Sequence, residues 1–291
     1  MSIDLLPQIL VIALEMAITY MLISLGLSVI FSVLGVVNFA HGDFFMLGAF
    51  GAYFLSQMVG TGYLWWLPLV ILSGCLLGVM IEKGIFLPLR RDHLGGLIAS
   101  FGMGFILQEV ACSIWGPDDR TVPSVVLGSF QIGSVFIPRE KLLLSIIGAI
   151  FIIVTLLIIH RFKIGRAIRA VAQDSDSATL CGINVNWTRM VTLMLGCTMA
   201  VSSGFVLSSL SNINPYMGGD YILKAFIVVI IGGLGSIYGA IVGSLLLAFV
   251  DAFGMVLIGV WSTLASFIIL ALVLLFRPYG LMGVIEREET K

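Results

Sequence analysis

The sequence predicts an all-α polytopic membrane protein with about eight membrane segments. Of its 291 residues, 59% are hydrophobic and only 11% are charged, and the mean hydropathy is +1.13. Because soluble domains carry roughly 25% charged residues, most of this chain must face lipid or other apolar helices. A spanning helix needs about 20 apolar residues, so the chain has room for about eight segments and their loops.

Six apolar stretches are expected to be full spans, at about residues 9–32, 64–82, 94–115, 142–160, 189–211 and 258–276. Two further stretches, at about 35–58 and 223–256, are interrupted by glycine and polar residues, which is typical of discontinuous or re-entrant helices. Span, broken segment, span and Pro with Arg occur in this order near the start and again near the end, which suggests an internal repeat. We expect residues 1–291 to form one transmembrane domain.

The basic residues predict the orientation of the loops. Of the 15 Lys and Arg residues, 11 lie in the segments 83–93, 161–189 and 277–291, which should therefore be cytoplasmic. The other four are Arg120, Arg139, Lys141 and Lys224, in or near the loops 116–141 and 212–224, which should lie outside. If both broken stretches enter and leave from the outside, the N-terminus is cytoplasmic.

Several classes of function are disfavoured by composition and motifs. The net charge of −1 and the lack of a basic tail give no indication of nucleic-acid binding. The four cysteines are widely separated, without a Cys-x-x-Cys pair, so a disulfide framework or a zinc site is not expected. The phosphate-binding pattern Gly-x-x-x-x-Gly-Lys-Ser/Thr is absent, so any ATP that drives this protein must bind to another subunit.

A polar group interrupts the first broken stretch at Asn38, His41, Gly42 and Asp43. Polar residues are costly at membrane depth unless they line a cavity or cap a broken helix. Asn38 can cap the amides of the following turn, and Gly42 permits close approach of backbone or solute. The group is therefore either a wall of a solute pathway or a set of helix-end contacts. A metal site is disfavoured because His41 and Asp43 lack a second pair of ligands nearby.

The second broken stretch holds Gly232, Gly233 and Gly235, with further glycines at three- and four-residue spacing. Glycines in this pattern permit close packing of helices. They also allow a helix to break beside a solute path. The sequence leaves both interpretations open.

The cytoplasmic segment 163–187 differs sharply in composition from the spans on either side. Gly165 opens a helical stretch with Ile168, Val171 and Ala172 on one side, and Asp174 interrupts it. A second short run follows and ends at Gly182, a good helix stop. Two short amphipathic helices could dock into a cytoplasmic partner, and the alternative is a solvated connector with snorkelling arginines.

Acidic residues within or beside spans offer a rival mechanism. Glu15, Glu82, Glu109 and Asp251 could relay protons, as in a self-sufficient proton-coupled carrier, or could pair with polar neighbours. A passive channel for urea or a similar neutral solute is a further alternative. A channel has no need of a structured cytoplasmic segment, and that segment disfavours both rivals.

Several motifs resemble the permeases of branched-chain amino acid ABC transporters. They are the run 36–43, Gly165-Arg166-Ala167 through Ala178, Gly182 and Ile183, Asn214-Pro215-Tyr216, Lys224-Ala225-Phe226, and Gly232-Gly233-Leu234-Gly235-Ser236. Each motif is weak by itself, but their order and spacing cover nearly the whole chain. The similarity is closest to the LivH-type branch of the family.

The resemblance implies a permease subunit, not an enzyme, of an ATP-driven importer for branched-chain or other amino acids in the bacterial inner membrane. Urea and short-chain amide permeases belong to the same family and remain an alternative. Implied partners are a second, LivM-type permease, two cytoplasmic ATPases that carry the ATP and Mg, and an extracytoplasmic solute-binding protein. The expected coupling segment, about 161–189, presents Gly165, Arg166, Arg169, Asp174, Ala178, Gly182 and Ile183 to an ATPase. The expected pathway residues are Asn38, His41, Gly42, Asp43, Asn212, Asn214, Gly232, Gly233 and Gly235.

Overall fold

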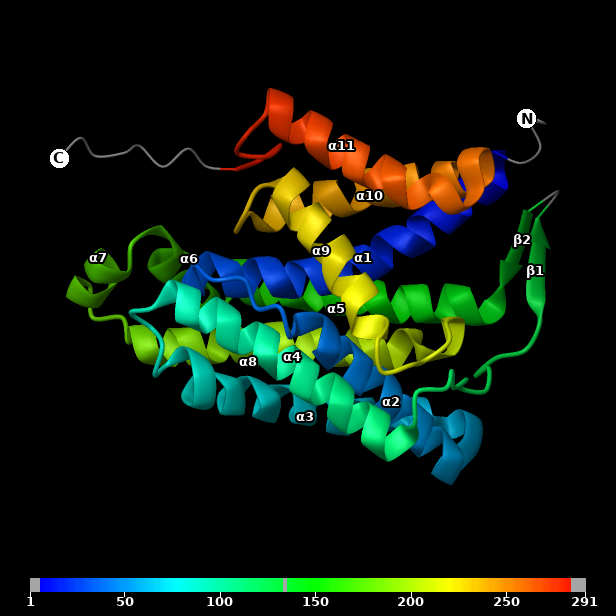
Figure 1. Cartoon of the computed structure of the whole chain (residues 1–291), viewed down its shortest axis with the longest axis horizontal. Coiled ribbons are helices and arrows are strands. Elements are labelled where there is room, and N and C mark those ends of the chain that lie inside the picture. Colours follow the sequence, from blue (N-terminus) through cyan, green and yellow to red (C-terminus); the bar gives the residue numbers. More distant parts are fainter. Residues whose placement is uncertain (1–5, 133–134, 284–291) are drawn as a thin grey trace.

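Long helices, most of them roughly aligned with the long axis of the molecule, make up most of the computed structural model, which describes residues 6–132 and 135–283 (Figure 1). The α-helices are α1 (Leu6–Leu34), α2 (His41–Val59), α3 (Leu67–Ile81), α4 (His93–Trp115), α5 (Arg139–Arg161), α6 (Lys163–Gln173), α7 (Ser175–Leu180), α8 (Val185–Leu207), α9 (Met217–Gly232), α10 (Ile237–Ile258) and α11 (Ser262–Phe276). Short 3₁₀ or π turns are η2 (Gly60–Trp66), η3 (Glu82–Phe86), η4 (Ser208–Leu210) and η5 (Gly259–Trp261). Two short strands, β1 (Ser129–Ile132) and β2 (Val135–Pro138), complete the fold.

The charged loops divide the molecule into two ends. Helices α6 and α7, the 87–92 loop and the end of α11 lie at one end, which we call the basic end (Figure 1). Strands β1 and β2, with the loops 116–128 and 208–216, lie at the other, which we call the hairpin end. The predicted grouping of the basic loops is therefore confirmed for the described residues. Arg287 and Lys291, which belong to the same prediction, lie outside the described residues.

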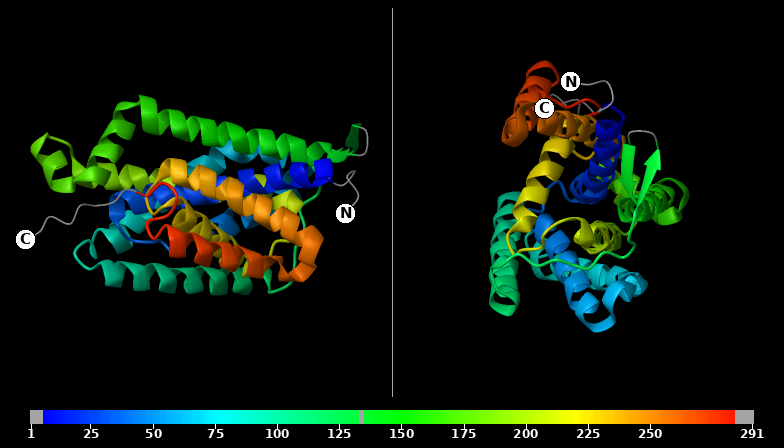
Figure 2. Two further views of the ribbon diagram at one scale, coloured as in Figure 1. Left: turned by 90° about the horizontal axis from the view of Figure 1, so that it is seen from above. Right: turned by 90° about the vertical axis from the view of Figure 1, so that its right-hand side faces the viewer.

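Helices α1 and α8 form the centre of the bundle, because 72% and 78% of the residues in their most apolar parts are buried. Small residues bring α3 and α8 into close contact. A Cβ on Gly74 would lie 2.6 Å from the Cα of Thr198, and one on Gly78 would lie 2.5 Å from the Cα of Met194. Seen end-on, α10 and α11 lie at one edge of the molecule and α2 and α3 at the other (Figure 2).

Polar side chains cap three of the long helices that begin at the basic end. The side chain of Asp92 accepts a hydrogen bond from the amide of Gly95 at the start of α4, and that of Asn184 accepts one from Trp187 at the start of α8. Ser236 caps α10 in the same way. These side chains satisfy amides that would otherwise lack partners in the first turn.

The first broken stretch is arranged differently from our prediction. The Gln8 side chain exchanges two hydrogen bonds with the backbone of Phe136, so α1 begins at the hairpin end and runs to the basic end. After a turn at Gly35 (φ 68°), residues 36–40 run back without helical structure, and α2 continues to the hairpin end. The stretch therefore does not enter and leave from one side. The expectation that the start of the chain shares the side of the basic loops is wrong for the part that begins at Leu6.

The second broken stretch is a helical hairpin. Helices α9 and α10 run antiparallel, and the turn 233–236 between them lies at the basic end, so both outer ends point to the hairpin end as expected (Figure 1). Within residues 6–132 and 135–283, six helical stretches are long and apolar enough to span a membrane, and α11, with 15 residues, falls short of that length. The predicted all-α class describes most of the structure, and what it did not include is the short hairpin of β1 and β2, which pair antiparallel from Ser129 with Pro138.

Candidate translocation and coupling sites

The polar group of the first broken stretch lies buried among the helices. His41 is fully buried, and its Nε2 lies 3.1 Å from the carbonyl oxygen of Ile23, well inside the long helix α1. Asn38 is 1% exposed, and neither atom of its side-chain amide has a hydrogen-bond partner among the residues that the structure describes. The predicted side-chain cap by Asn38 is therefore absent, and the N-cap residue of α2 is Ala40. Instead, the Asn38 carbonyl accepts a hydrogen bond from the His41 amide at 3.2 Å.

Two helices begin in this buried region and meet at their first turns. A Cβ on Gly42 would overlap the carbonyl oxygen of Gly218, so the backbones of α2 and α9 are in direct contact. Neither helix has a side-chain cap, in contrast to α4, α8 and α10. Helix N-termini carry a partial positive charge, and broken helices with such ends are a recurring feature of transporter pathways.

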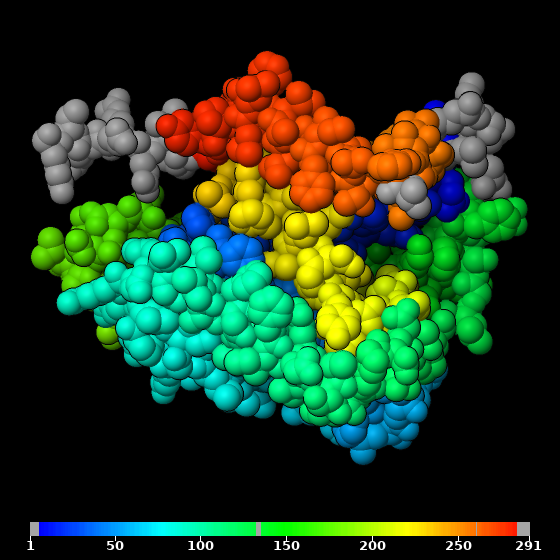
Figure 3. Space-filling model, in the orientation of Figure 1, coloured from blue at the N-terminus to red at the C-terminus, as the bar shows by residue number. Residues whose placement is uncertain are grey.

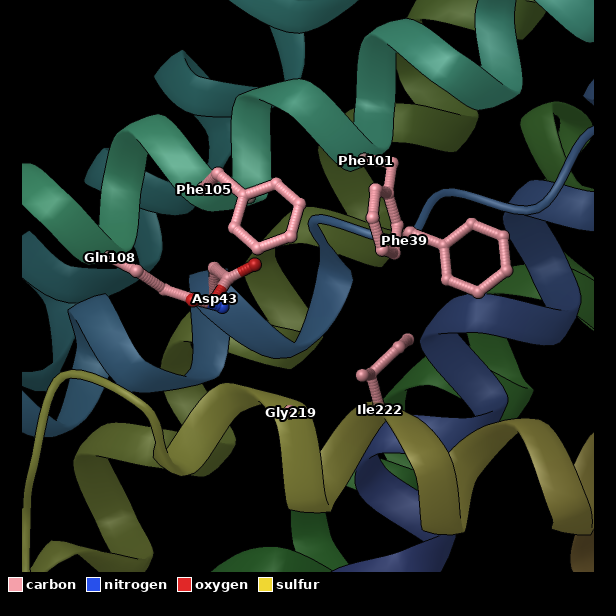
Figure 4. A pocket seen from close by; sticks show the side chains of 8 residues that line it. Phe39, Asp43, Phe101, Phe105, Gln108, Gly219 and Ile222 are labelled. Carbon is pink, nitrogen blue, oxygen red and sulfur yellow. The ribbon is translucent and has the colours of Figure 1, made fainter.

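A cavity of about 180 Å³ opens beside this contact. Asp43 lies on it and is 4% exposed, and its Oδ1 accepts a hydrogen bond of 2.8 Å from Nε2 of Gln108 on α4 (Figure 4). The remaining lining is apolar apart from backbone: Phe39, Phe101, Gly104, Phe105, Gly219 and Ile222. The space-filling view shows α4 and α9 on either side, with blue residues of the first part of the chain visible between them (Figure 3).

The two predicted asparagines lie at the hairpin end. Their amide groups donate to the carboxylate of Asp119, from Asn212 at 3.2 Å and from Asn214 at 3.0 Å. Between them, Ile213 forms a backbone bridge with Arg120. The structure therefore places these asparagines beside the outer loop 116–128, on the segment that leads into α9, and not on the cavity.

The predicted glycines of the second broken stretch do not reach the cavity. Gly232 and Gly233 lie in the α9–α10 turn, where the Gly232 carbonyl accepts a hydrogen bond of 2.8 Å from the Met282 amide. A Cβ on Gly233 would lie 2.4–2.6 Å from backbone atoms of Gly283, so the turn leaves no room for a side chain. Gly235 packs on the end of α1 at Ser32. These positions support the close-packing interpretation of this motif.

The predicted cytoplasmic helices are present as α6 and α7. Gly165 packs against the end of α5, where a Cβ would overlap the carbonyl oxygen of Ile159. Arg169 donates a hydrogen bond to the same carbonyl, while Arg166 is exposed. Ile168 and Val171 are buried as expected. Ala172, which we predicted to lie on the same face of the helix, is exposed.

Asp174 separates the two helices because its side chain caps α7. Its Oδ1 accepts from the amides of Asp176 and Ser177, at 2.9 and 3.2 Å. A hydrogen bond from the Ser177 hydroxyl, followed by these amides, lowers the pKa of the Asp174 carboxyl below its usual value. Ala178 is buried under α7, and the Ile183 amide donates to its carbonyl at 3.0 Å.

The tip of this projection exposes an apolar side chain. Leu180, the last residue of α7, is 89% exposed, and Gly182 follows in the left-handed region at φ 80°. The Leu180 side chain is therefore available for contact with a protein partner at the tip of the projection.

Two residues, Gln108 and Lys224, form contacts that the sequence alone does not indicate. Gln108 was treated as an ordinary residue of a span, and only its contact with Asp43, 65 positions away, reveals its place. Lys224 was placed near an outer loop, but it lies within α9 and pairs with Asp251 at 2.8 Å. A polar residue in each apolar run was the only available signal.

Three of the four acidic residues proposed as proton relays have basic partners. Glu15 pairs with Lys141 at 3.1 Å and Glu82 with Arg189 at 3.4 Å, in addition to the pair that Asp251 forms. Glu109 is exposed on α4. Within the described ranges 6–132 and 135–283, no three His, Cys, Asp or Glu residues are grouped as metal ligands would be.

The part of the chain that the structure describes is mostly helical, with six candidate spans, a largely apolar cavity that holds one buried carboxylate, and a structured projection at one end, which is the organisation of a membrane permease. The chain belongs to the family described as branched-chain amino acid transport system / permease component, whose model matches residues 9–276.

Individual relatives agree with this family. The chain is 32% identical to the high-affinity branched-chain amino acid transport system permease protein BraD of Pseudomonas aeruginosa, over 97% of both chains. It is 31% identical to the corresponding protein LivH of Escherichia coli K12, over 93% of both chains. The permease protein LivM of Salmonella typhimurium is 22% identical over 92% of this chain and 68% of its own length. No solved structure matches the chain.

Proposed function

We propose that this chain is a transmembrane permease subunit of an ATP-driven importer that translocates branched-chain or other amino acids across the bacterial inner membrane. The observation that carries this proposal is the α6–α7 projection, a capped helical element with an exposed leucine at the basic end. It accompanies membership of the permease family and similarity to BraD and LivH. The chain itself catalyses no reaction and binds no cofactor in this proposal.

The projection is the coupling element. Two partner ATPases, which hold the ATP and Mg, close and reopen in this scheme, and α7 transmits their motion to α5 and α8. Gly165 and Arg169 fix the projection on the end of α5, so a force on the tip reaches a membrane helix directly. Differential stabilisation of inward and outward states by ATP is what such a cycle requires.

The cavity between α2, α4 and α9 is part of the translocation pathway. It opens on one flank of the chain, and its polar floor at Asp43 would be costly against lipid. A second, related permease of the LivM type is therefore proposed to cover this flank. An extracytoplasmic binding protein delivers solute at the hairpin end, where Asn212 and Asn214 meet Asp119.

The finer architecture follows the same proposal. Residues 1–291 form one permease domain with its coupling segment at about 161–189. Both halves contain a helix that begins at membrane depth, α2 in one and α9 in the other, which supports an internal repeat. About eight membrane segments are consistent with this arrangement, with α3 and α11, of 15 residues each, as the shortest.

The rival mechanisms have less support. A proton-coupled carrier needs titratable groups that change partners, and three of the four acidic residues are held in ion pairs. A passive urea channel gives no role to a capped cytoplasmic projection. Urea or amide transport by an ATP-driven permease is disfavoured by the names of the relatives, which all specify branched-chain amino acids.

The first experiment is copurification of the chain from its native membrane in mild detergent, with mass spectrometry of the retained proteins. We expect a second permease and two ATP-binding subunits, and leucine uptake when the complex is reconstituted with its binding protein and ATP. A stable homo-oligomer that transports without ATP would contradict the proposal.

Variants of the projection test its role in the same preparation. Leu180→Asp should release the ATPases, whereas Leu234→Asp, at another exposed leucine of the basic end, should retain them. Gly182→Val places a β-branched residue at a positive φ, which should shift the tip of the projection. We expect the subunits of this variant to assemble, but the loaded binding protein should no longer stimulate ATP hydrolysis. Normal stimulation in Gly182→Val would argue against the coupling role.

A further inference from the structure

Asp43 is one of two buried acidic residues of the described chain without a basic partner, and the other, Glu140 at the start of α5, accepts a hydrogen bond from a backbone amide. Glu82 and Asp251 each have a basic partner within 3.4 Å, but none of the ion pairs within residues 6–132 and 135–283 includes Asp43. It accepts a hydrogen bond from the side-chain amide of Gln108, and this donor carries no charge. A buried carboxylate without a cationic partner is costly, and in a membrane protein it marks a functional site.

Glycines keep both oxygens of this carboxylate in a narrow space. A Cβ on Gly104 of α4 would lie 2.5 Å from Oδ2 of Asp43, and a Cβ on Gly218 of α9 would lie 2.7 Å from Oδ1. A side chain at either position would displace the carboxylate. The chain therefore holds one negative group at the meeting point of three helices, α2, α4 and α9.

The cavity in front of the carboxylate is otherwise apolar. Phe101 and Phe105 of α4 stand edge-to-face with centroids 5.0 Å apart, and Phe39 meets Phe101 at 5.6 Å. Ile222 of α9 points toward these rings (Figure 4). Such walls favour an aliphatic group of the ligand and supply no second charge.

We propose that Asp43 binds the α-ammonium group of the transported amino acid. Gln108 orients the Asp43 carboxylate, and the cavity walls formed by Phe101, Phe105 and Ile222 hold the aliphatic side chain of the ligand. This inference rests on the proposed function. A single carboxylate facing apolar walls in about 180 Å³ matches a small ligand with one cationic group and a branched hydrocarbon body. A neutral amide such as urea offers neither feature.

Direct binding to the purified complex in nanodiscs tests the chemistry of the ligand. Three probes are titrated by calorimetry: leucine, isoamylamine, which lacks the carboxylate, and 4-methylpentanoate, which lacks the ammonium group. We expect leucine and isoamylamine to bind and 4-methylpentanoate to bind at least about tenfold more weakly, as the loss of one charge-assisted hydrogen bond implies. Equal binding of 4-methylpentanoate and isoamylamine would overturn the proposal.

Transport by variants tests the residue. Asp43→Asn should lower ATP-driven leucine uptake about tenfold or more while stimulation of ATP hydrolysis by the loaded binding protein persists. Asp43→Glu should recover part of the uptake because it restores the negative charge. Glu109→Gln is the matched control, since it removes an exposed carboxylate one residue from Gln108 and should transport normally.

The outcomes separate the two proposals. Leucine uptake by the unmodified complex together with unchanged uptake by Asp43→Asn overturns the ammonium site and leaves the importer intact. Absence of ATP-driven leucine uptake in the unmodified complex overturns the proposed function itself. If Asp43→Asn fails to assemble, the three-probe titration of the unmodified complex still decides the chemistry.

Discussion

At the scale of single residues, the buried pair of Lys224 and Asp251 links four helices. Asp251 of α10 also accepts hydrogen bonds from Tyr20 of α1, at 2.6 Å, and from Ser266 of α11, at 2.5 Å, while Lys224 belongs to α9. The side chains of Lys224 and Asp251 are 18% and 4% exposed. Each charge is therefore satisfied by the other and by hydroxyl groups, and the network positions α9, whose first turns line the cavity.

Removing one member of this pair should be far worse than removing both. Lys224→Met leaves a buried carboxylate without its cation, at a cost of about 3–5 kcal/mol by analogy with buried pairs in soluble proteins. The double variant Lys224→Met with Asp251→Leu should lose much less. Thermal unfolding in detergent, followed by size exclusion, measures both. A double variant that is less stable than Lys224→Met would show that the hydroxyl contacts, not the charges, matter.

The cap of α7 should depend on pH. Hydrogen bonds in the folded protein lower the pKa of Asp174, so it stabilises α7 fully above its unfolded pKa of about 3.9 and progressively less as the pH falls through the folded value. Amide exchange at Asp176 and Ser177, compared at about pH 5 and below pH 4 after correction for intrinsic rates, should show the loss of protection. Asp174→Asn keeps a neutral cap, so its protection should not change over this range.

The sequence was sufficient to locate polar residues but not their partners. Asn38, His41, Gly42 and Asp43 stand out because they interrupt an apolar run, and they do lie buried among the helices. Gln108 and Lys224 interrupt their runs equally, but their role depends on contacts with residues 65 and 27 positions away. Such contacts are set by the packing of whole helices, which a local pattern does not contain.

At the scale of elements, glycine determines how closely α2 and α8 pack. A Cβ on Gly48 would overlap the carbonyl oxygen of Val201, and one on Gly204 would overlap that of Phe45. On the same helix, Gly51 has no atom within 4 Å of the corresponding position. One helix thus offers a crowded and an open glycine a single turn apart.

These two glycines give a matched test. Gly48→Ala should separate α2 from α8 and destabilise the protein by about 1–3 kcal/mol or more. Gly51→Ala should be neutral, or stabilising by up to about 1 kcal/mol, because alanine favours a helix. Thermal unfolding of both purified variants measures the difference, and equal stability would mean that the helices pack less closely than described.

Local chemistry explains which elements could be predicted. Helices α6 and α7 follow from an amphipathic pattern bounded by Asp174 and Gly182, and both residues act as helix ends in the structure. The starts of α2 and α9 could not be placed, because these helices begin without capping side chains and are fixed by their mutual contact. Strands β1 and β2 escaped notice because each has only four residues.

At the scale of the whole molecule, charge predicted which loops share an end, but not the direction of the first helix. The segment before α1 carries too little positive charge to determine its side. What places α1 is tertiary: its first residues contact β2, and its last residues pack on the α9–α10 turn. The non-helical residues 36–40 then let the chain return through the bundle. The first broken stretch therefore runs from the basic end to the hairpin end, whereas we expected it to enter and leave from one side.

This arrangement predicts a topology that impermeant thiol reagents can test. Leu6→Cys and Ser129→Cys, at the hairpin end, should be labelled by an impermeant maleimide added outside intact cells. The native Cys181, exposed in the projection, should react only after the cells are opened. Cys75, Cys112 and Cys197 are first replaced by serine or alanine, and Cys181 is replaced as well in the Leu6→Cys and Ser129→Cys proteins, so that each signal has one source. Labelling of Ser129→Cys but not Leu6→Cys from outside would place the start of α1 with the basic loops and contradict the described path of the first helix.

Labelling of Cys181 in intact cells would instead invert the orientation inferred from the basic residues and remove the coupling segment from the reach of cytoplasmic ATPases.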